Sequence, residues 1–190
     1  MITSLFRKTT PLNYAFVIIM VVIFFLIYQF HGGTLTNAVP VMAQKAGLLA
    51  ILLASIWIVN FIAKKNGLCK DSSYVILFSF LLLLFFPSVL NDPNLIISNF
   101  FILLAFRRII SLQSLKFPKE KIFDASLWIF VAALFHFSSI LVIILSFSTI
   151  LIHAARSYRS WLLPFKALYP WCVLVILFTL HFDRFGFAGV

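Results

Sequence analysis

Acidic residues and cysteines are few in this chain, and each shortage limits the kinds of site that it can hold. Asp and Glu number five and Cys two in 190 residues. Cys69 lies in a basic stretch and Cys172 inside an apolar run, with no CxxC pair and no regular Cys/His spacing. We therefore expect neither a disulfide nor a zinc site. The histidines are too scattered to form a metal set, so we expect no metal and no cofactor: His31, His136, His153 and His181.

Charge of either sign is also scarce. Charged residues make up 11% of the chain and hydrophobic residues 63%, which is more apolar material than a soluble domain of this size contains. The net charge of +10 comes from fifteen Lys and Arg that stand in short clusters between apolar runs. Such clusters are typical of loops beside membrane helices, so we expect membrane lipids rather than nucleic acid as the surroundings of this chain.

The apolar runs predict an all-α fold, a polytopic transmembrane helix bundle that forms a single domain over residues 1–190. We expect about six membrane segments, at residues 11–30, 47–63, 73–90, 93–106, 126–152 and 167–182. The fourth is short, about 21 Å as a helix, and spans only where the bilayer thins or its arginines snorkel. Residues 109–124 alternate apolar and basic side chains, which predicts a helix extension at the membrane surface.

Local signals predict where several of these helices begin and end. Pro11 follows a threonine that can act as N-cap, and Pro93 follows Asp92, which can do the same. Gly67 is expected to stop the second helix, and Pro87 is placed in the last turn of the third. Residues 31–44 are expected to form a loop that lies partly in the membrane interface.

The segment 126–152 organises the expected fold, because it is about 40 Å long as a helix and its only ionisable residue is His136. One interpretation is that small side chains let a neighbouring helix approach, while serine hydroxyls and the imidazole bond across the contact. The other is that His136 lines a polar cavity as a proton carrier or ligand group. Both start from a stripe repeated every seven residues: Ala125, Ala132, Ser139, Ser146 and His153.

The basic residues predict an orientation. With six crossings and a cytoplasmic N-terminus, eleven of the fifteen Lys and Arg lie on the inner side, as positively charged loops prefer. The exception is the connector after residue 152, which holds Arg156, Arg159 and Lys166 on the outer side. Arg156 and Arg159 fit a lipid-linked phosphate, since guanidinium binds phosphate oxygens bidentately. The alternative is that these arginines anchor the connector to anionic lipid headgroups.

Asp92 would be the only acidic residue on that outer face. A carboxylate there can act as a general base for glycosyl transfer or as a metal ligand. The alternative is that Asp92 only caps the helix that begins at Pro93.

Four stretches resemble an uncharacterised family of multi-pass inner-membrane proteins of Bacteroidetes, and the resemblance covers essentially the whole chain. The stretches are residues 1–14 (MITSLFRKTTPLNY), 64–74 (KKNGLCKDSSY), 86–101 (FPSVLNDPNLIISNFF) and 107–128 (RRIISLQSLKFPKEKIFDASLW). The resemblance implies location in the bacterial inner (cytoplasmic) membrane and a longer protein, of which this chain would be the N-terminal part. That family has no assigned activity.

A second set of residues is similar in layout to membrane glycosyltransferases and polysaccharide polymerases that use polyprenyl-linked sugars. It consists of Pro87, Asp92, residues 100–105 (FFILLA), Arg107 and residues 132–141 (AALFHFSSIL). This resemblance implies a cell-envelope glycosyltransferase or polymerase that acts on a polyprenyl-phosphate-linked glycan.

Two hypotheses for function follow. In the first, the protein is such a transferase, with Arg156 and Arg159 holding the phosphate and Asp92 or His136 handling protons. In the second, it is a non-catalytic membrane subunit or scaffold of an envelope complex, whose small-residue stripe packs against other membrane proteins. A transporter fits less well, because His136 has no intramembrane acid as a partner.

Overall fold

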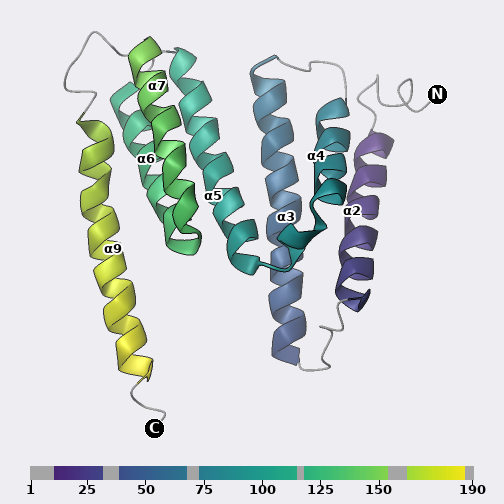
Figure 1. The fold of residues 1–190 in the computed structure, drawn as a ribbon. Coiled ribbons are helices and arrows are strands. Elements are labelled where there is room, and N and C mark those ends of the chain that lie inside the picture. The colour runs from purple at the N-terminus through teal and green to yellow at the C-terminus, as the bar shows by residue number, and fades with distance from the viewer. Residues whose placement is uncertain (1–10, 32–38, 68–72, 115–117, 154–161, 187–190) are drawn as a thin grey trace. The chain divides into compact units, whose positions relative to one another are not determined.

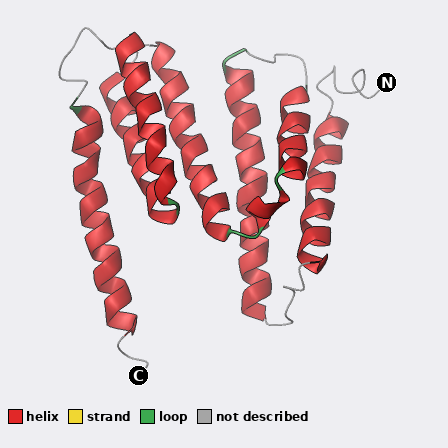
Figure 2. Cartoon of the chain, in the orientation of Figure 1, coloured by secondary structure: helices red, strands yellow, loops and turns green. Residues whose placement is uncertain are grey.

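The computed structural model describes residues 11–31, 39–67, 73–114, 118–153 and 162–186 (Figure 1). All regular structure in these ranges is helical, as the sequence predicts (Figure 2). The chain divides into two compact units, Met1–Leu103 and Leu104–Val190, and each is described by itself. The expected single domain over residues 1–190 stays a prediction.

The N-terminal unit contains helices α2 (Pro11–His31), α3 (Val39–Lys65) and α4 (Tyr74–Phe85), the short 3-10 helix η1 (Pro87–Leu90) and the first part of α5 (Pro93–Ile110). Helix α2 begins at Pro11, as predicted. Helix α3 begins at Val39 rather than at residue 47, because proline is well accommodated in a first turn and Pro40 occupies that place. The Lys64 ammonium lies 4.8 Å from the ring centre of Tyr14, which joins the end of α3 to the start of α2.

Gly67 ends α3, which confirms the prediction. Its φ of 70° is left-handed, and its N–H donates to the Lys64 carbonyl at 3.1 Å. This bond belongs to the common glycine-terminated C-cap, in which a left-handed residue turns the chain back over the last carbonyls of the helix.

The third and fourth predicted segments differ from the structure. Helix α4 ends at Phe85, not at residue 90, because Pro87 lacks an N–H and disfavours helical geometry at Phe86, whose φ and ψ are −124° and 62°. Helix α5 is not short, because Arg107 and Arg108 continue it to Ile110. Its 18 residues extend about 27 Å.

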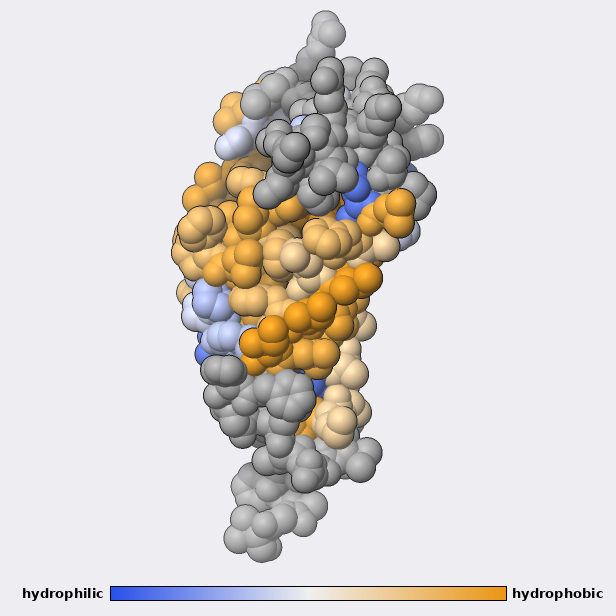
Figure 3. Space-filling model, turned by 90° about the vertical axis from the view of Figure 1, so that its right-hand side faces the viewer, coloured by the Kyte–Doolittle hydropathy of each residue, from blue (hydrophilic) through white to orange (hydrophobic). Residues whose placement is uncertain are grey.

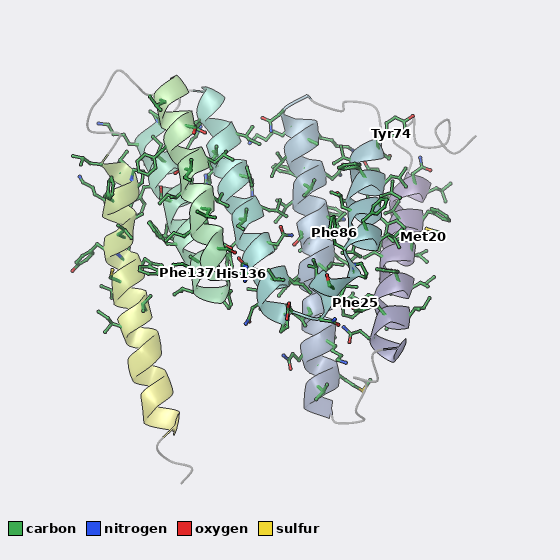
Figure 4. The ribbon with its side chains drawn as sticks, viewed as in Figure 1. Met20, Phe25, Tyr74, Phe86, His136 and Phe137 are labelled. Carbon is green, nitrogen blue, oxygen red and sulfur yellow. The ribbon has the colours of Figure 1, made fainter. Side chains whose placement is uncertain are left out.

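Burial in α2 is inverted for its polar residues and for many of its apolar ones, compared with a water-soluble helix. Asn13 and Gln29 are each 8% exposed and share the buried face with Val17, Val21 and Phe25, whereas the large apolar side chains of the outward face are 40% to 80% exposed. Met20 points away from the unit and Phe25 toward it (Figure 4). The face on the α2 side is accordingly apolar across its middle (Figure 3). Such a surface is stable when hydrocarbon surrounds it, since lipid solvates apolar side chains and leaves polar groups to find partners inside.

The C-terminal unit contains the rest of α5, η2 (Ser111–Ser114), α6 (Pro118–Phe135), η3 (Phe137–Val142), α7 (Ile143–His153) and α9 (Leu163–Gly186). The prediction of one helix over residues 126–152 is wrong. The chain leaves the helix at His136, whose φ of −144° and ψ of 108° are extended, and α7 runs back along α6 (Figure 1). We name residues 118–153 the hairpin.

Packing between the two arms explains why this apolar run does not continue as one helix. Small side chains from both arms are buried, with Ala125 and Ala132 0% exposed on α6 and Ser139 and Ser146 at most 5% exposed on η3 and α7. These four members of the predicted stripe are therefore buried, but they lie on different elements. Ser146 donates to the Ile143 carbonyl of its own helix at 2.7 Å, so its hydroxyl proton is used within α7.

Residues 109–124 do not form the predicted helix extension, because α5 ends at Ile110 and η2 follows it. The predicted position at the membrane surface stays a prediction. Ile109, Leu112 and Ile122 are buried in the C-terminal unit. Polar contacts tie α5 and η2 to α6, with Arg108 Nη2 3.2 Å from Asp124 Oδ2 and Lys121 Nζ donating to the Ser111 carbonyl at 2.7 Å.

Helix α9 packs on α6. Trp171 Nε1 donates to the Phe130 carbonyl at 2.7 Å, and the two rings lie 5.7 Å apart between centres. Ala167 is completely buried, and a small side chain there lets the two helices approach closely. The predicted sixth segment, residues 167–182, falls within α9.

Three helices in the described residues are long and apolar enough to cross a membrane: Leu12–Gln29, Val41–Lys65 and Pro93–Ile110. With the inverted burial of α2, they support a helical membrane protein. The predicted count of six crossings is not confirmed.

We expect Gly67→Ala to lower the free energy of unfolding by about 1 kcal/mol, because a left-handed φ is costly for a residue with a Cβ. Thermal unfolding in detergent, followed by circular dichroism, measures the change. Gly47→Ala is the matched control, since a Cβ at this position within α3 meets nothing within 4 Å. It should leave stability unchanged or raise it. Equal losses in both variants would contradict the capping role of Gly67.

Candidate functional site

A pocket of about 550 Å³ opens inside the N-terminal unit, between α3, α4, η1 and the first part of α5. Each helix contributes one face, as the three- and four-residue spacings of its lining residues show. The lining consists of Leu52, Ser55, Ile56 and Val59 from α3, Val75, Phe78, Ser79, Leu82 and Leu83 from α4, Phe86 and Val89 at η1, and Ile96, Asn99 and Leu103 from α5.

Because α4 ends early, the interruption between α4 and η1 lies at the pocket wall. Phe86 is the residue at which α4 passes into η1, and it lies there beside α3 (Figure 4). Because η1 is a single tight turn, α5 begins only a few residues later and returns along the same pocket. Leu90 and Ile96, on either side of the turn, are 2% and 3% exposed and anchor it in the core of the unit.

The pocket wall offers little polarity to an occupant. Ser55 Oγ donates to the Ile51 carbonyl and Ser79 Oγ to the Val75 carbonyl, each at 2.9 Å. Both hydroxyl protons are therefore used within their own helices. Asn99 adds an exposed carboxamide to the wall formed by α5. No Lys, Arg, Asp or Glu is among the lining residues described above.

The pocket lies in the parts of α3 and α5 that have membrane-crossing character. Leu52 and Val59 fall well inside the apolar window Val41–Lys65, and Asn99 falls inside Pro93–Ile110. Apolar pockets that carry a few polar groups are the usual form of small-molecule sites. At bilayer depth, the molecules at hand to fill such a pocket are hydrocarbon chains.

Asp92 lies at the start of α5, where the capping interpretation placed it. Its carbonyl accepts the N–H groups of Leu95 and Ile96 at 3.1 and 3.4 Å, which is the backbone pattern of an N-cap residue. The residue is exposed and does not line the pocket.

His136 lies at the tip of the hairpin, exposed, beside Phe137 (Figure 4). It is not in the middle of a helix, so the predicted place within a continuous polar stripe is wrong. Its N–H donates to the Ala132 carbonyl and its carbonyl accepts the Ser139 N–H, both at 3.0 Å. The backbone of His136 thus joins the two arms.

The structure does not bring the predicted site residues together within one unit. Asp92 belongs to the N-terminal unit and His136 to the C-terminal unit, while Arg156 and Arg159 lie outside the described residues. Within the described ranges, no group of three or more His, Cys, Asp or Glu has the arrangement of a metal site.

Sequence reasoning missed the pocket residues. Of these residues, Asn99 could have been recognised from the sequence, since a carboxamide within an apolar helix is costly unless it has a partner or a role. Ser55 and Ser79 gave no signal, because serines that bond to their own helix are common in membrane segments.

The chain matches no protein-family model, no curated protein and no solved structure. The two resemblances stated from the sequence stay predictions.

We expect Asp92→Ala to lower the free energy of unfolding by about 1 kcal/mol and Asp92→Asn to leave it nearly unchanged, because asparagine caps a helix as well as aspartate does and alanine does not. Chemical unfolding in detergent measures both variants. If asparagine destabilised the protein as much as alanine, the negative charge rather than the cap would be the property that matters.

Proposed function

We propose that this chain is an integral membrane protein that binds the hydrocarbon chain of a membrane lipid in the pocket of its N-terminal unit. The observation that supports this function best is the pocket itself, which is apolar and lies between helices of membrane-crossing character. Hydrocarbon burial needs no directed polar contact and scales with the apolar area removed from other surroundings.

The side chains of the pocket wall favour a hydrocarbon chain as the ligand over an ion or a sugar. A sugar needs several hydrogen-bonding groups directed at it, whereas Ser55 and Ser79 already donate to their own helices. An ion needs charge or several oxygen ligands, and the lining residues provide no charged side chain. Asn99 supplies one carboxamide, enough to orient a single polar group of the ligand.

The open side of the pocket is bordered by aromatic rings. Phe78 and Phe86 line it and are 62% and 61% exposed. Rings in this position offer a flat apolar edge along which a chain can slide in from the bilayer. The polyprenyl chain of a lipid-linked glycan, the partner expected from the sequence, is the ligand that we propose, in the inner membrane and with a cytoplasmic N-terminus.

The geometry favours a non-catalytic role over glycosyl transfer. Asp92 has the backbone role of an N-cap, and the backbone of His136 joins the two arms of the hairpin. We therefore propose that the protein holds or presents the lipid-linked glycan as a subunit of an envelope complex. The glycosyltransferase or polymerase remains the alternative, in which Asp92 or His136 handles protons and Arg156 and Arg159 hold the phosphate.

Ser79→Phe tests the pocket, because it adds a phenyl ring to a lining position on α4. The probes are a polyprenyl phosphate and a diacyl phospholipid, each carrying a photoreactive diazirine in its chain, incubated with purified protein. In the unaltered protein we expect crosslinks to peptides of α3, α4 and α5, and Ser79→Phe should reduce them at least five-fold.

Ser148→Phe is the matched control. Ser148 is an exposed serine of α7 that donates to the Ile144 carbonyl at 3.0 Å, the same type of bond as at Ser79, and it lies outside the pocket. It should leave crosslinking unchanged, and size-exclusion profiles confirm that both variants fold. Equal crosslinking in all three proteins would refute the pocket. Preference for one probe identifies the class of chain.

A second experiment separates binding from catalysis in cells that depend on this chain for an envelope glycan. Ser79→Phe should reduce the glycan, whereas Asp92→Asn should not, because asparagine keeps the cap and removes only the acid. Loss of the glycan in Asp92→Asn, with the protein still folded, would favour the transferase.

A further inference from the structure

The first arm of the hairpin is too short to be an ordinary membrane-crossing helix. Helix α6 carries Lys119, Glu120, Lys121 and Asp124 in its first two turns, which leaves an apolar arm from Ala125 to Phe135 of about 16 Å. The second arm consists of η3 and α7, is about 28 Å long and returns along α6 from the tip. The hydrocarbon core of a bilayer is about 30 Å thick, so the apolar part of the first arm reaches about half way, and it limits the depth of the tip.

The hairpin nevertheless has the surface of a membrane segment. Large apolar side chains lie on the outside of its second arm, with Phe137 80%, Leu141 64% and Ile144 61% exposed. Its small and polar residues Ser126, Ser139 and Ser146 are buried instead. This is the inverted burial that α2 shows, so hydrocarbon is the surrounding that suits these side chains.

Both open ends of the hairpin lie at one end of the C-terminal unit. Leu112 of η2 and Ile122 near the start of α6 form one buried cluster, and Phe147 of α7 and Leu163 at the start of α9 pack against it. The rings of Phe147 and Phe165 are 5.8 Å apart between centres, which ties the end of α7 to the start of α9. The tip at His136 lies away from this cluster, at the far end of the arms (Figure 4).

The distribution of Lys and Arg favours a hairpin that returns to the membrane face at which it began. Only Arg184 of the nine Lys and Arg in the C-terminal unit falls near the far end of α9. The other eight belong to the polar stretches that flank the hairpin and its connectors: Arg107, Arg108, Lys116, Lys119, Lys121, Arg156, Arg159 and Lys166. A return to one face places all eight on the same side, as the preference of positive loops for a single side requires. A crossing at residues 126–152 divides them between the two sides.

We propose that residues 118–153 form a re-entrant hairpin, which enters the bilayer, turns at His136 within it and leaves by the face it entered. The starts of α6 and α9 then lie on the same side of the membrane. This topology lacks the single crossing at residues 126–152 from which the sequence predicts an outward position for Arg156 and Arg159. This topology is independent of what the N-terminal pocket binds.

Single cysteines at two exposed positions test the topology in a protein with Cys69→Ser and Cys172→Ser. Lys119→Cys marks the start of the hairpin, and Leu162→Cys marks the start of α9. Each variant is labelled with a membrane-impermeant maleimide, first on sealed right-side-out vesicles and then after permeabilisation. The re-entrant hairpin requires the same pattern in both variants, either labelling before permeabilisation or labelling only after it.

Opposite patterns at the two positions would overturn the proposal, because they require an odd number of crossings between them. Lys166→Cys repeats the second position on an exposed residue of α9, in case Leu162→Cys does not fold. Phe137→Cys reports the tip. It should resist the reagent in vesicles, or react only from the face that Lys119→Cys reports. Reaction from the other face alone means two complete crossings and refutes re-entry.

Discussion

Hydrocarbon as the surrounding medium is the constraint on which the rest of this structure depends. It offers no hydrogen-bond partner, so each segment must satisfy its backbone within itself, and helices achieve this. The same demand acts on hydroxyls: Ser55, Ser79, Ser126 and Ser148 all donate to carbonyls one turn earlier in their own helices. Small and weakly polar side chains can then lie on the buried side of each unit beside its apolar core, and many bulky apolar side chains face outward.

Under this constraint, the places where a helix stops are the informative ones. At Phe86 the chain stops because a proline follows, and the resulting turn forms part of a pocket wall. At His136 it stops without proline or glycine, and the arms close on their small residues. In both cases the chain regains helical hydrogen bonding within a few residues, since a 3-10 turn begins directly after the break. The interruptions thus stay brief and leave few backbone groups to satisfy.

The helix ends that depend on local chemistry could be predicted from the sequence. Pro11, Gly67 and Pro93 act within one turn of themselves, and the structure has helix boundaries at each of them. Pro87 also signals a helix end. It was expected in the last turn of the third helix, whereas α4 ends at Phe85, two residues earlier. Pro40 likewise indicated the true start of α3, which apolar content alone placed later in the chain.

The break at His136 and the pocket could not be predicted in this way. An apolar run without glycine or proline has the same local preference whether it continues or folds back, so contacts of α6 with η3 and α7 decide the matter. Leu52 and Leu103 line the same pocket, and spacing along the sequence carries no information on pairs so far apart. Asp92 and His136 were chosen as the chemistry-bearing residues of their segments, and their place in one site stays a prediction.

The serine bonds in the pocket bear on how the ligand that we propose would be distinguished there. With the hydroxyl protons of Ser55 and Ser79 directed at carbonyls, these two hydroxyls point along their helices rather than into the cavity. For this part of the wall, a saturated chain and an isoprenoid chain would differ in cross-section, stiffness and the bulk of branch methyls. Selectivity for such a ligand would then depend on steric fit, and small changes in side-chain volume at α4 would alter it.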